Sequence, residues 1–344
     1  MGSKKSKNKS KWVRPCWFLL LCIVALLTGC SAQDAENTDE VEWTGNPFDD
    51  EFLNDESVQY AYGFGLNIPD ADTNMVYAGE PIEAEYFVEN LGDEMSVGML
   101  MFVDGIPQIY AVDGGEPTYL HILKVPACEK ITVPISFTPV QGNYGENCSV
   151  RFLSILNPDL RPDKVEYVFG HTGAMTTFLP RFIEMQRSVS IQPKVYPQMD
   201  AQRNMTPEEV AQVIYVDRRG RTIDRMKSFN LIVRNPENME LPYLPVENNV
   251  LTFELQGYGG NAGSYLLIPF INHLPVQADG LPGILTVETG EKMYERSLSL
   301  DISILDAEYY GIEKYNTFYM MAIPLDGDSL LDPVQSALFV FVGE

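Results

Sequence analysis

Residues 82–89 read Ile-Glu-Ala-Glu-Tyr-Phe-Val-Glu, an alternation in which every second side chain is apolar and Glu83, Glu85 and Glu89 lie between them. Successive side chains of a β-strand point to opposite faces, so this pattern predicts a strand with one buried face. The same period of two recurs at Ile131–Phe137, where Pro134 indicates an edge strand or a bulge, and at Leu298–Ile304. These segments favour antiparallel sheets.

Turn residues separate the strand-like segments at short intervals, as in Asp113-Gly114-Gly115 and Asp326-Gly327-Asp328. Many short strands spaced in this way predict β-sandwiches rather than a parallel α/β sheet. One helix is expected, because Thr206-Pro207-Glu208-Glu209 combines an N-cap Thr, a first-turn Pro and a Glu three residues after the cap. It should reach about Ile214.

A weak internal repeat links Phe102-Val103-Asp104-Gly105-Ile106-Pro107 to Phe270-Ile271-Asn272-His273-Leu274-Pro275. A long strand pair follows each copy, at 131–156 and 298–323, so we expect two copies of one sandwich. The predicted domains span residues 58–195 and 196–344. This layout resembles the paired immunoglobulin-like domains of bacterial surface lipoproteins, although the Cys…Trp…Cys hallmark of antibody domains is missing. The resemblance implies a mainly β protein that binds or spaces rather than catalyses.

The N-terminus carries six basic residues up to Arg14, followed by an apolar run from Cys16 to Leu27. A membrane-spanning helix needs about 20 apolar residues, so this run fits a signal peptide instead. Its end, Leu27-Thr28-Gly29-Cys30, resembles the lipobox of bacterial lipoproteins. The resemblance implies cleavage after residue 29 and a diacylglycerol on Cys30 that holds the chain at the cell membrane. The alternative is an ordinary secretory signal. The long basic segment suggests a Gram-positive source.

Residues 30–57 are acidic and aperiodic, which predicts a flexible tether that lifts the folded part off the membrane. The chain has 24 basic and 48 acidic residues. Removing the six basic residues of the signal leaves 18 against 48, a net charge of about −30. Nucleic acid is therefore excluded as a partner, because its phosphates would be repelled. The acidity indicates either solubility near an anionic wall or a surface that binds cations.

Two cysteines, Cys128 and Cys148, remain in the folded part. Each precedes or opens a strand-like run, so a simple antiparallel pairing of the runs would place them at opposite ends, too far apart for a disulfide. We expect two free, buried thiols.

Two weak binding hypotheses arise from local patterns. Asp70, Asp72 and Asn74 have the D-x-D-x-N start of a calcium loop, but Met75 and Pro81 stand where the loop needs Gly and Glu. An acidic turn is the favoured interpretation, and calcium is the only cofactor considered. Arg218, Arg219 and Arg221 form a basic group that could bind an anionic wall polymer, or could pair with the acidic first domain, which we favour.

The sequence contains no recognisable catalytic motif. His121, His171 and His273 are scattered, and Gly257–Gly263 lacks the following helix that a dinucleotide loop requires. No tryptophan lies after Trp43, which weakens glycan binding. We therefore expect a non-enzymatic, lipid-anchored, extracytoplasmic binding or spacer module whose partner is a cell-wall polymer or an envelope protein. The alternatives are a cell-wall or glycan hydrolase with paired carboxylates, and a solute-binding receptor.

Overall fold

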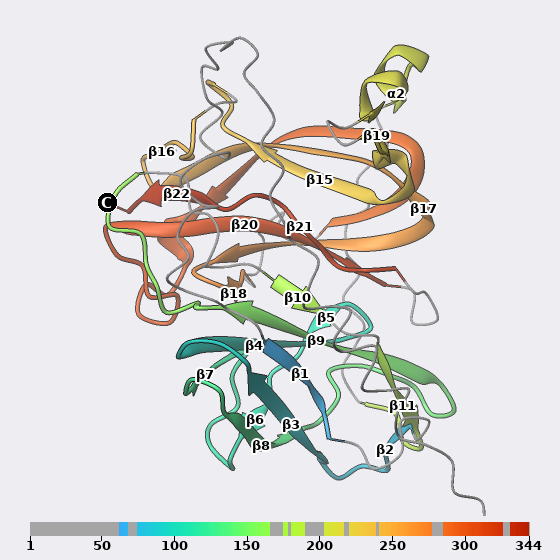
Figure 1. Cartoon of the computed structure of the whole chain (residues 1–344), viewed down its shortest axis with the longest axis vertical. Helices are drawn as coiled ribbons and strands as arrows, with labels where there is room; N and C mark the ends of the chain where they lie inside the picture. The colour runs from blue at the N-terminus through green and yellow to red at the C-terminus, as the bar shows by residue number, and fades with distance from the viewer. Residues whose placement is uncertain are drawn as a thin grey trace, which may run out of the picture. The chain divides into compact units, whose positions relative to one another are not determined.

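A computed structural model describes residues 62–67, 74–165, 175–177, 180–189, 203–216, 220–238, 241–276, 285–325 and 331–343. The predicted signal peptide, tether and domain boundary near residue 195 lie outside these ranges. The chain is mainly β and forms β-sandwiches, as predicted (Figure 1). In the described ranges, no helix is long and apolar enough to cross a membrane.

The first sandwich comprises β1–β11, in two sheets. One sheet has the order β1-β3-β8-β6, with bounds Tyr62–Leu66, Ile82–Asn90, Lys130–Phe137 and Ala111–Val112. The other has the order β2-β11-β9-β4-β5, with bounds Met75–Tyr77, Arg181–Met185, Asn147–Leu156, Met95–Val103 and Ile106–Pro107. To these, β10 (Met175–Thr177) adds on β9 and β7 (Leu120–Val125) adds on β4. On β3, Ile82, Tyr86 and Val88 are buried and the three glutamates are exposed, which confirms the predicted alternation.

The second sandwich comprises β12–β22. Its main sheet has the order β12-β19-β17-β20-β21, with bounds Arg203–Asn204, Leu285–Asp301, Val250–Ile271, Tyr315–Pro324 and Val334–Gln335. Strands β15 (Phe229–Arg234), β16 (Val246–Glu247) and β18 (Leu274–Pro275) pair with β17, and β22 (Phe339–Val342) pairs with β20. A separate hairpin joins β13 (Ile214–Val216) to β14 (Thr222–Asp224).

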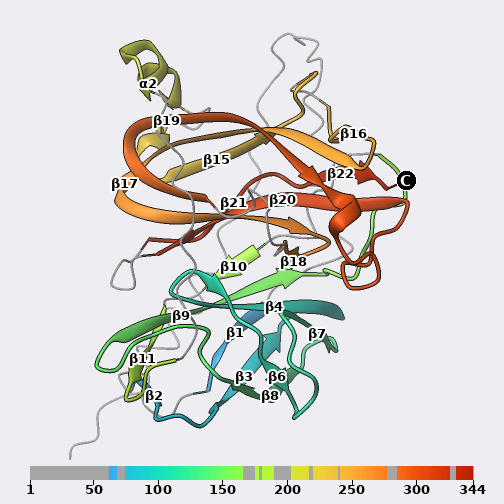
Figure 2. The ribbon, with the colours of Figure 1, turned by 180° about the vertical axis from the view of Figure 1, so that it is seen from behind.

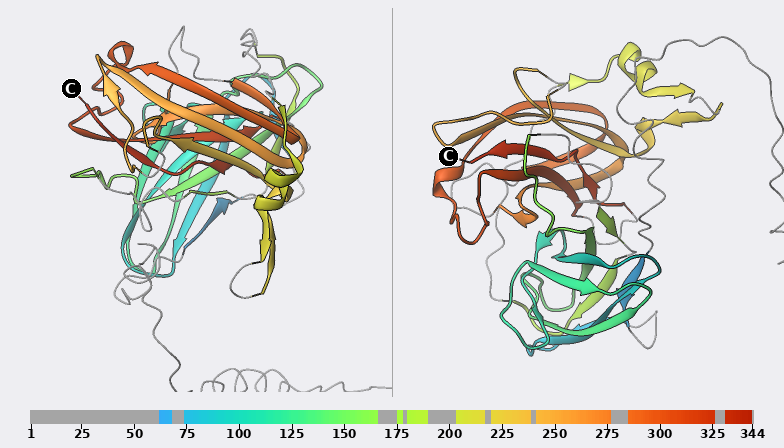
Figure 3. Two further views of the ribbon diagram at one scale, coloured as in Figure 1. Left: turned by 90° about the horizontal axis from the view of Figure 1, so that it is seen from above. Right: turned by 60° about the vertical axis from the view of Figure 1, so that its left-hand side comes forward.

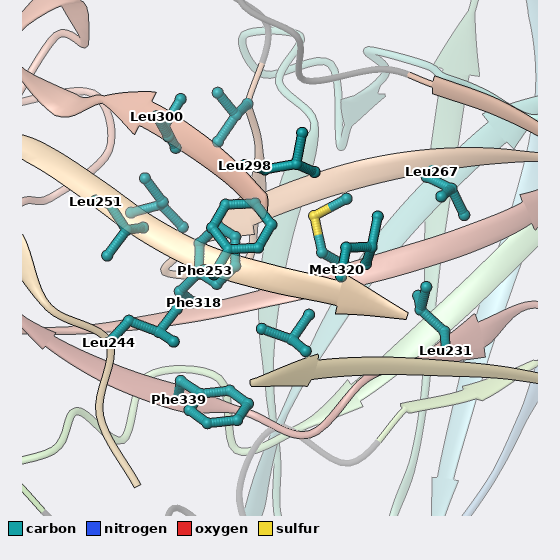
Figure 4. Packing of buried hydrophobic residues seen from close by; sticks show 14 of the residues in the cluster. Leu231, Leu244, Leu251, Phe253, Leu267, Leu298, Leu300, Phe318, Met320 and Phe339 are labelled. Atoms are coloured by element: carbon teal, nitrogen blue, oxygen red, sulfur yellow. The ribbon is translucent and has the colours of Figure 1, made fainter. Parts of the chain in front are cut away.

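Strand β17 bends so that its two halves belong to opposite layers of the second sandwich (Figure 2). The register with β19 shifts between Tyr258 and Ser264, where Gly259 and Gly260 have φ angles of +77° and +89°. A Cβ on Gly259 would lie 2.9 Å from the carbonyl oxygen of Ser228, so both the backbone conformation and the close approach require glycine. The glycine-rich segment is thus a bend within a strand. Between the layers pack aromatic and aliphatic side chains such as Phe253, Phe318 and Met320 (Figure 4).

The predicted strand at Leu298–Ile304 is correct only to Asp301, where β19 ends. Ile302–Ile304 form the 3₁₀ turn η2, because the Asp301 carboxylate accepts a hydrogen bond from the Ser303 N–H at 2.9 Å. A side-chain cap of this kind competes with continuation of the strand.

The predicted helix is confirmed as α2, Pro207–Val213. The Thr206 hydroxyl accepts from the Glu209 N–H, and the Glu209 carboxylate accepts from the Thr206 N–H, which completes a capping box. Arg203 donates two hydrogen bonds of 2.6 Å to the same carboxylate. Together these bonds lower the pKa of Glu209 to about 2.

The structure confirms the two hairpins of the internal repeat, but the strand pairs predicted after them are wrong: among the described residues β8 does not pair with β9, and β19 does not pair with β20. In both hairpins the register is the same, with Phe102 opposite Pro107 on β4–β5 and Phe270 opposite Pro275 on β17–β18. Phe270 lies 168 positions after Phe102, and the same offset relates the two strand pairings that follow. Val97 pairs with Leu156 between β4 and β9, and the residues 168 positions later, Tyr265 and Pro324, pair between β17 and β20. In each copy a turn side chain, Asp104 or Asn272, accepts from a backbone N–H of the next long strand, at 2.6 and 2.9 Å.

A hydrophobic cluster joins the two copies, and we call it the shared layer. Every residue of β4 is buried, because one face of the strand lines the core of the first sandwich and the other contributes to this cluster. The same positions of each copy meet there: Leu100 and Ile268, Phe102 and Phe270, Leu153 and Met321, Ile155 and Ile323. A long apolar run in both β4 and the second half of β17 follows from burial on two sides.

Both cysteines are free, as expected, but the reason given for this was wrong. Strands β8 and β9 are not an antiparallel pair: β8 pairs with β3 and β6, and β9 lies in the other sheet. Cys128 is exposed, contrary to prediction, because it occupies a turn with a φ of +57°. Cys148 is buried, and desolvation together with the Asp104 carboxylate raises the pKa of its thiol to about 12.

Candidate binding face

The outer surface of β15, β17 and β19 carries polar side chains in ordered cross-strand rows. The inner residues of these strands, such as Leu231, Phe253 and Leu298, are buried, which leaves the intervening positions facing away from the core. In one row Arg234 lies opposite Glu254, and in the next Gln256 lies opposite Glu295. We call this surface, with α2 and the β13–β14 hairpin beside it, the binding face.

A groove of about 430 Å³ lies on the binding face. Its polar lining consists of two arginines, two glutamates, one glutamine and one serine: Arg234, Arg296, Glu254, Glu295, Gln256 and Ser297. The Gln256 Nε2 donates to Glu295 Oε1 at 2.7 Å, which fixes both side chains in the groove wall. The groove therefore offers both hydrogen-bond donors and acceptors from the outer face of the sheet, whereas Arg296 stands opposite buried Leu255 and follows the inner positions of β19.

Beyond one end of the groove, the face becomes apolar. Tyr258 and Met293 are buried there with Met205, and Val210, Val213, Met226 and Ile232 pack against them. Helix α2 contributes two of these side chains although none of its residues is fully buried. The helix thus covers the sheet through a small satellite core.

The β13–β14 hairpin leads from α2 towards β15 and exposes three large apolar side chains. Ile214, Tyr215 and Val216 are 38, 42 and 66% exposed. In Figure 3 the helix and hairpin, in yellow, project from the second sandwich. Exposed apolar side chains next to basic ones are typical of surfaces that bind a partner rather than of a solvated loop.

Arg225 connects the hairpin to the sheet. Its guanidinium lies over the Tyr215 ring, 5.8 Å from the centroid. Hydrogen bonds with Tyr258 and Tyr215 raise the pKa of Arg225, so it stays charged. One arginine thus holds an exposed aromatic ring of the hairpin and a buried tyrosine of β17.

The residues predicted from sequence are only partly placed. Arg221 is exposed directly before β14, while Arg218 and Arg219 lie outside the described residues. Asn74 is exposed, and Asp70 and Asp72 lie outside the described residues as well. In the described part of the chain no three His, Cys, Asp or Glu side chains gather as a metal would require. Calcium binding and lipidation of Cys30 stay predictions.

Two of the histidines make structural contacts. The His121 Nε2 lies 2.7 Å from the carbonyl oxygen of Tyr110, and burial lowers its pKa. His273 is 3% exposed with Nδ1 3.2 Å from the Tyr319 hydroxyl. Desolvation, helped by the nearby Arg161 charge, lowers the pKa of His273 to about 3. His171 lies outside the described residues.

Sequence reasoning did not identify Arg234, Glu254 or Glu295. The run Phe253-Glu254-Leu255-Gln256 has the alternation of a half-buried strand. Its polar residues form part of a groove only once β15 and β19 lie on either side of them. Those strands come from segments about 20 and 40 residues away, and their register is not visible in the sequence.

No family model and no curated protein matches the chain. Among solved structures, it is similar to a protein of unknown function from Porphyromonas gingivalis W83, with 8% identity, 80% of this chain and 97% of that chain covered, and a TM-score of 0.22. It is also similar to the Salmonella enterica SafA pilin in complex with the SafB chaperone, with 12% identity, 83% and 97% covered, and a TM-score of 0.23. The third is the CsuC–CsuE chaperone–tip adhesion subunit complex of Acinetobacter baumannii, with 11% identity, 81% and 98% covered, and a TM-score of 0.20.

Proposed function

We propose that this chain is a lipid-anchored, extracytoplasmic binding module of the bacterial cell envelope. A diacylglycerol on Cys30 holds it in the cell membrane, and the acidic tether of residues 30–57 extends the folded part towards its partner. The partner is an anionic wall polymer, and the module acts on it by binding rather than by catalysis.

The observation that carries this proposal is the β13–β14 hairpin. On a chain of net charge −24, it combines exposed Ile214, Tyr215 and Val216 with a basic segment that includes Arg221 and Arg225. Guanidinium groups bind phosphate in bidentate fashion, and adjacent aromatic surface adds contact area. The filled cores of both sandwiches support a rigid body that presents this hairpin.

Binding is tested with the full chain in detergent and immobilised, purified teichoic acid as the probe. The variant Arg218→Ala/Arg219→Ala/Arg221→Ala should weaken binding at least tenfold, and raising the salt from low to high concentration should weaken the wild type similarly. The matched control is Lys124→Ala/Lys130→Ala on the first sandwich, which also removes positive charge. Equal loss in the control, or no binding by the wild type, would refute the proposal.

Anchoring is tested in cells that are fed a clickable palmitate analogue. The wild type should carry the label and sediment with membranes. Cys30→Ala should lose the label and leave the membrane fraction, because two acyl chains are needed for firm attachment. Cys128→Ala is the control for a cysteine that should not be acylated. An unchanged membrane fraction for Cys30→Ala would show that the anchor lies elsewhere.

A hydrolase is the second candidate, favoured by the placement of Glu254 and Glu295 in one groove. Glycosidases use such a pair as acid and as base or nucleophile. The test is release of reducing ends from purified cell-wall glycan by the wild type, Glu254→Gln and Glu295→Gln. Turnover that both variants abolish would establish the hydrolase and replace the non-catalytic proposal.

A further inference from the structure

The groove on the binding face differs in charge from the hairpin beside it. Arg234 lies among Glu254, Gln256, Glu295 and Ser297 on the outer face of the sheet, whereas the hairpin is basic. A phosphate in the groove would meet two carboxylates, and a cation would meet the Arg234 guanidinium. The ligand that suits such a lining is uncharged and rich in hydroxyls, since each hydroxyl both donates and accepts.

Arg234 and Glu254 stand opposite each other in the groove without forming a pair with one another. Arg234 and Glu254 are direct cross-strand neighbours, yet in the part of the chain that the structure describes no hydrogen bond or ion pair joins them. Both side chains are half-buried, so each has lost part of its hydration. A half-buried donor and acceptor held apart can each bind a ligand atom placed between them.

One wall of the groove is held in place. The Gln256 amide donates to Glu295 Oε1 at 2.7 Å and also lies 3.7 Å from the Met293 sulfur. Because its NH₂ group is used in this way, the Gln256 carbonyl oxygen is left to accept from a ligand.

We propose that this groove binds a neutral saccharide unit, so that a polymer on the binding face contacts the groove through its sugar and the hairpin through its negative charge. This inference rests on the proposed function, because it takes the binding face as the recognition surface. The groove also lies next to the hairpin along β17. Tyr258, two residues after Gln256 on this strand, forms a hydrogen bond with Arg225, which directly follows β14.

The experiment titrates the full chain in detergent with a panel of neutral oligosaccharides: oligomers of glucose, galactose, mannose and N-acetylglucosamine. At least one should bind, with little dependence on salt. Glu254→Gln and Arg234→Gln should each weaken that binding tenfold or more. Ser299→Ala, on the solvent face of β19 one row from the groove, is the matched control and should bind as the wild type does. Unchanged melting temperatures verify that the variants fold.

The arginine variant of the hairpin separates this inference from the proposed function. It should keep saccharide binding and lose teichoic acid. Failure of the whole panel to bind, equal binding by Glu254→Gln, Arg234→Gln and the wild type, or loss of the saccharide in the hairpin variant would each overturn the groove assignment. Teichoic acid binding that persists alongside such a result would leave the proposed function standing.

Discussion

The two sandwiches share an inner layer and differ on their outer sheets. Strands β4, β5 and β9 have the same register as the second half of β17, β18 and β20, and β4, β9, β17 and β20 all contribute to the shared layer. The outer sheet of the first sandwich instead shows exposed Glu83, Glu85 and Glu89 and is built on a separate strand, β3. In the second, a continuous β17 crosses between the layers, and the outer surface carries α2, the hairpin and the groove.

This difference shows where each copy is constrained. A strand buried on both faces must pack against two cores at once, so a change in its register or in the volume of one of its side chains disturbs the packing of at least one core. An outer sheet matches one core only, and its solvent face can change without cost to packing. The shared layer therefore holds the structure, and the outer face of the second sandwich provides the binding surface.

The largest expected effect comes from the shared layer. Phe102→Ala and Phe270→Ala should each lower the free energy of unfolding by about 3–5 kcal/mol, because each leaves a large cavity in a fully buried site. Urea unfolding measured by tyrosine fluorescence and by circular dichroism gives the comparison. A substitution that is costly in one copy and tolerated in the other would show that the layer is not shared equally.

The two equivalent turns should respond differently to an exchange of their residues. Asn272 is 2% exposed and donates to Tyr310 O and Asn316 Oδ1 at 3.0 Å, which an aspartate cannot do. Asn272→Asp should cost roughly 2–3 kcal/mol of unfolding free energy, from a buried charge and lost bonds. Asp104→Asn keeps the acceptor and should cost much less. Chemical denaturation tests the pair, and equal costs would contradict the assigned bonds.

The same turns differ in their second residue, Gly105 against His273. The pKa of folded His273 is about 3, below the ordinary value of 6.5, so the folded state resists protonation. Its contribution is complete above pH 6.5 and declines as pH falls towards 3, by about 2 kcal/mol between pH 7.5 and 5. His273→Asn should reduce the pH dependence by that amount, since Asn also accepts the positive φ of +69°. Identical slopes in wild type and variant would contradict the buried neutral imidazole.

The smallest expected change in stability comes from buried tyrosine hydroxyls in the core of the first sandwich. The inner face of β17 presents Leu251, Phe253 and Leu255, whereas β3 presents Tyr86, whose buried hydroxyl has no hydrogen-bond partner among the described residues. Tyr86→Phe should stabilise the fold by about 1 kcal/mol, because the unpaired hydroxyl is removed. Tyr110→Phe should destabilise it by about the same, since that hydroxyl donates to Met99 O at 2.6 Å. Thermal melting of the two variants measures both effects. Melting temperatures that shift in the same direction for Tyr86→Phe and Tyr110→Phe would contradict the assignment of one unpaired and one hydrogen-bonded hydroxyl.

Local patterns predicted much of the fold. The period of two located β3, the capping residues located α2, and the hairpins at Phe102–Pro107 and Phe270–Pro275 revealed the repeat. The shared layer was not predicted, because an apolar run such as β4 indicates burial without indicating what covers each face. The prediction of β8 beside β9 failed for a related reason: neighbouring segments in sequence can belong to opposite sheets of a sandwich.

The binding face was predicted least well. The basic segment at Arg218–Arg221 was recognised, because its charge contrasts with the acidic chain. The groove depends on three strands whose polar residues converge only after folding, and each of those residues alone resembles an ordinary solvent-facing one.

Hydrogen–deuterium exchange of the full chain in detergent, with and without purified teichoic acid, tests the central claim most directly. We predict protection confined to the β13–β14 hairpin and the neighbouring β15, β17 and β19 segments, with none on the outer sheet of the first sandwich. Protection on β1, β3 and β8 instead, or no protection anywhere, would contradict the assignment of binding to the second sandwich.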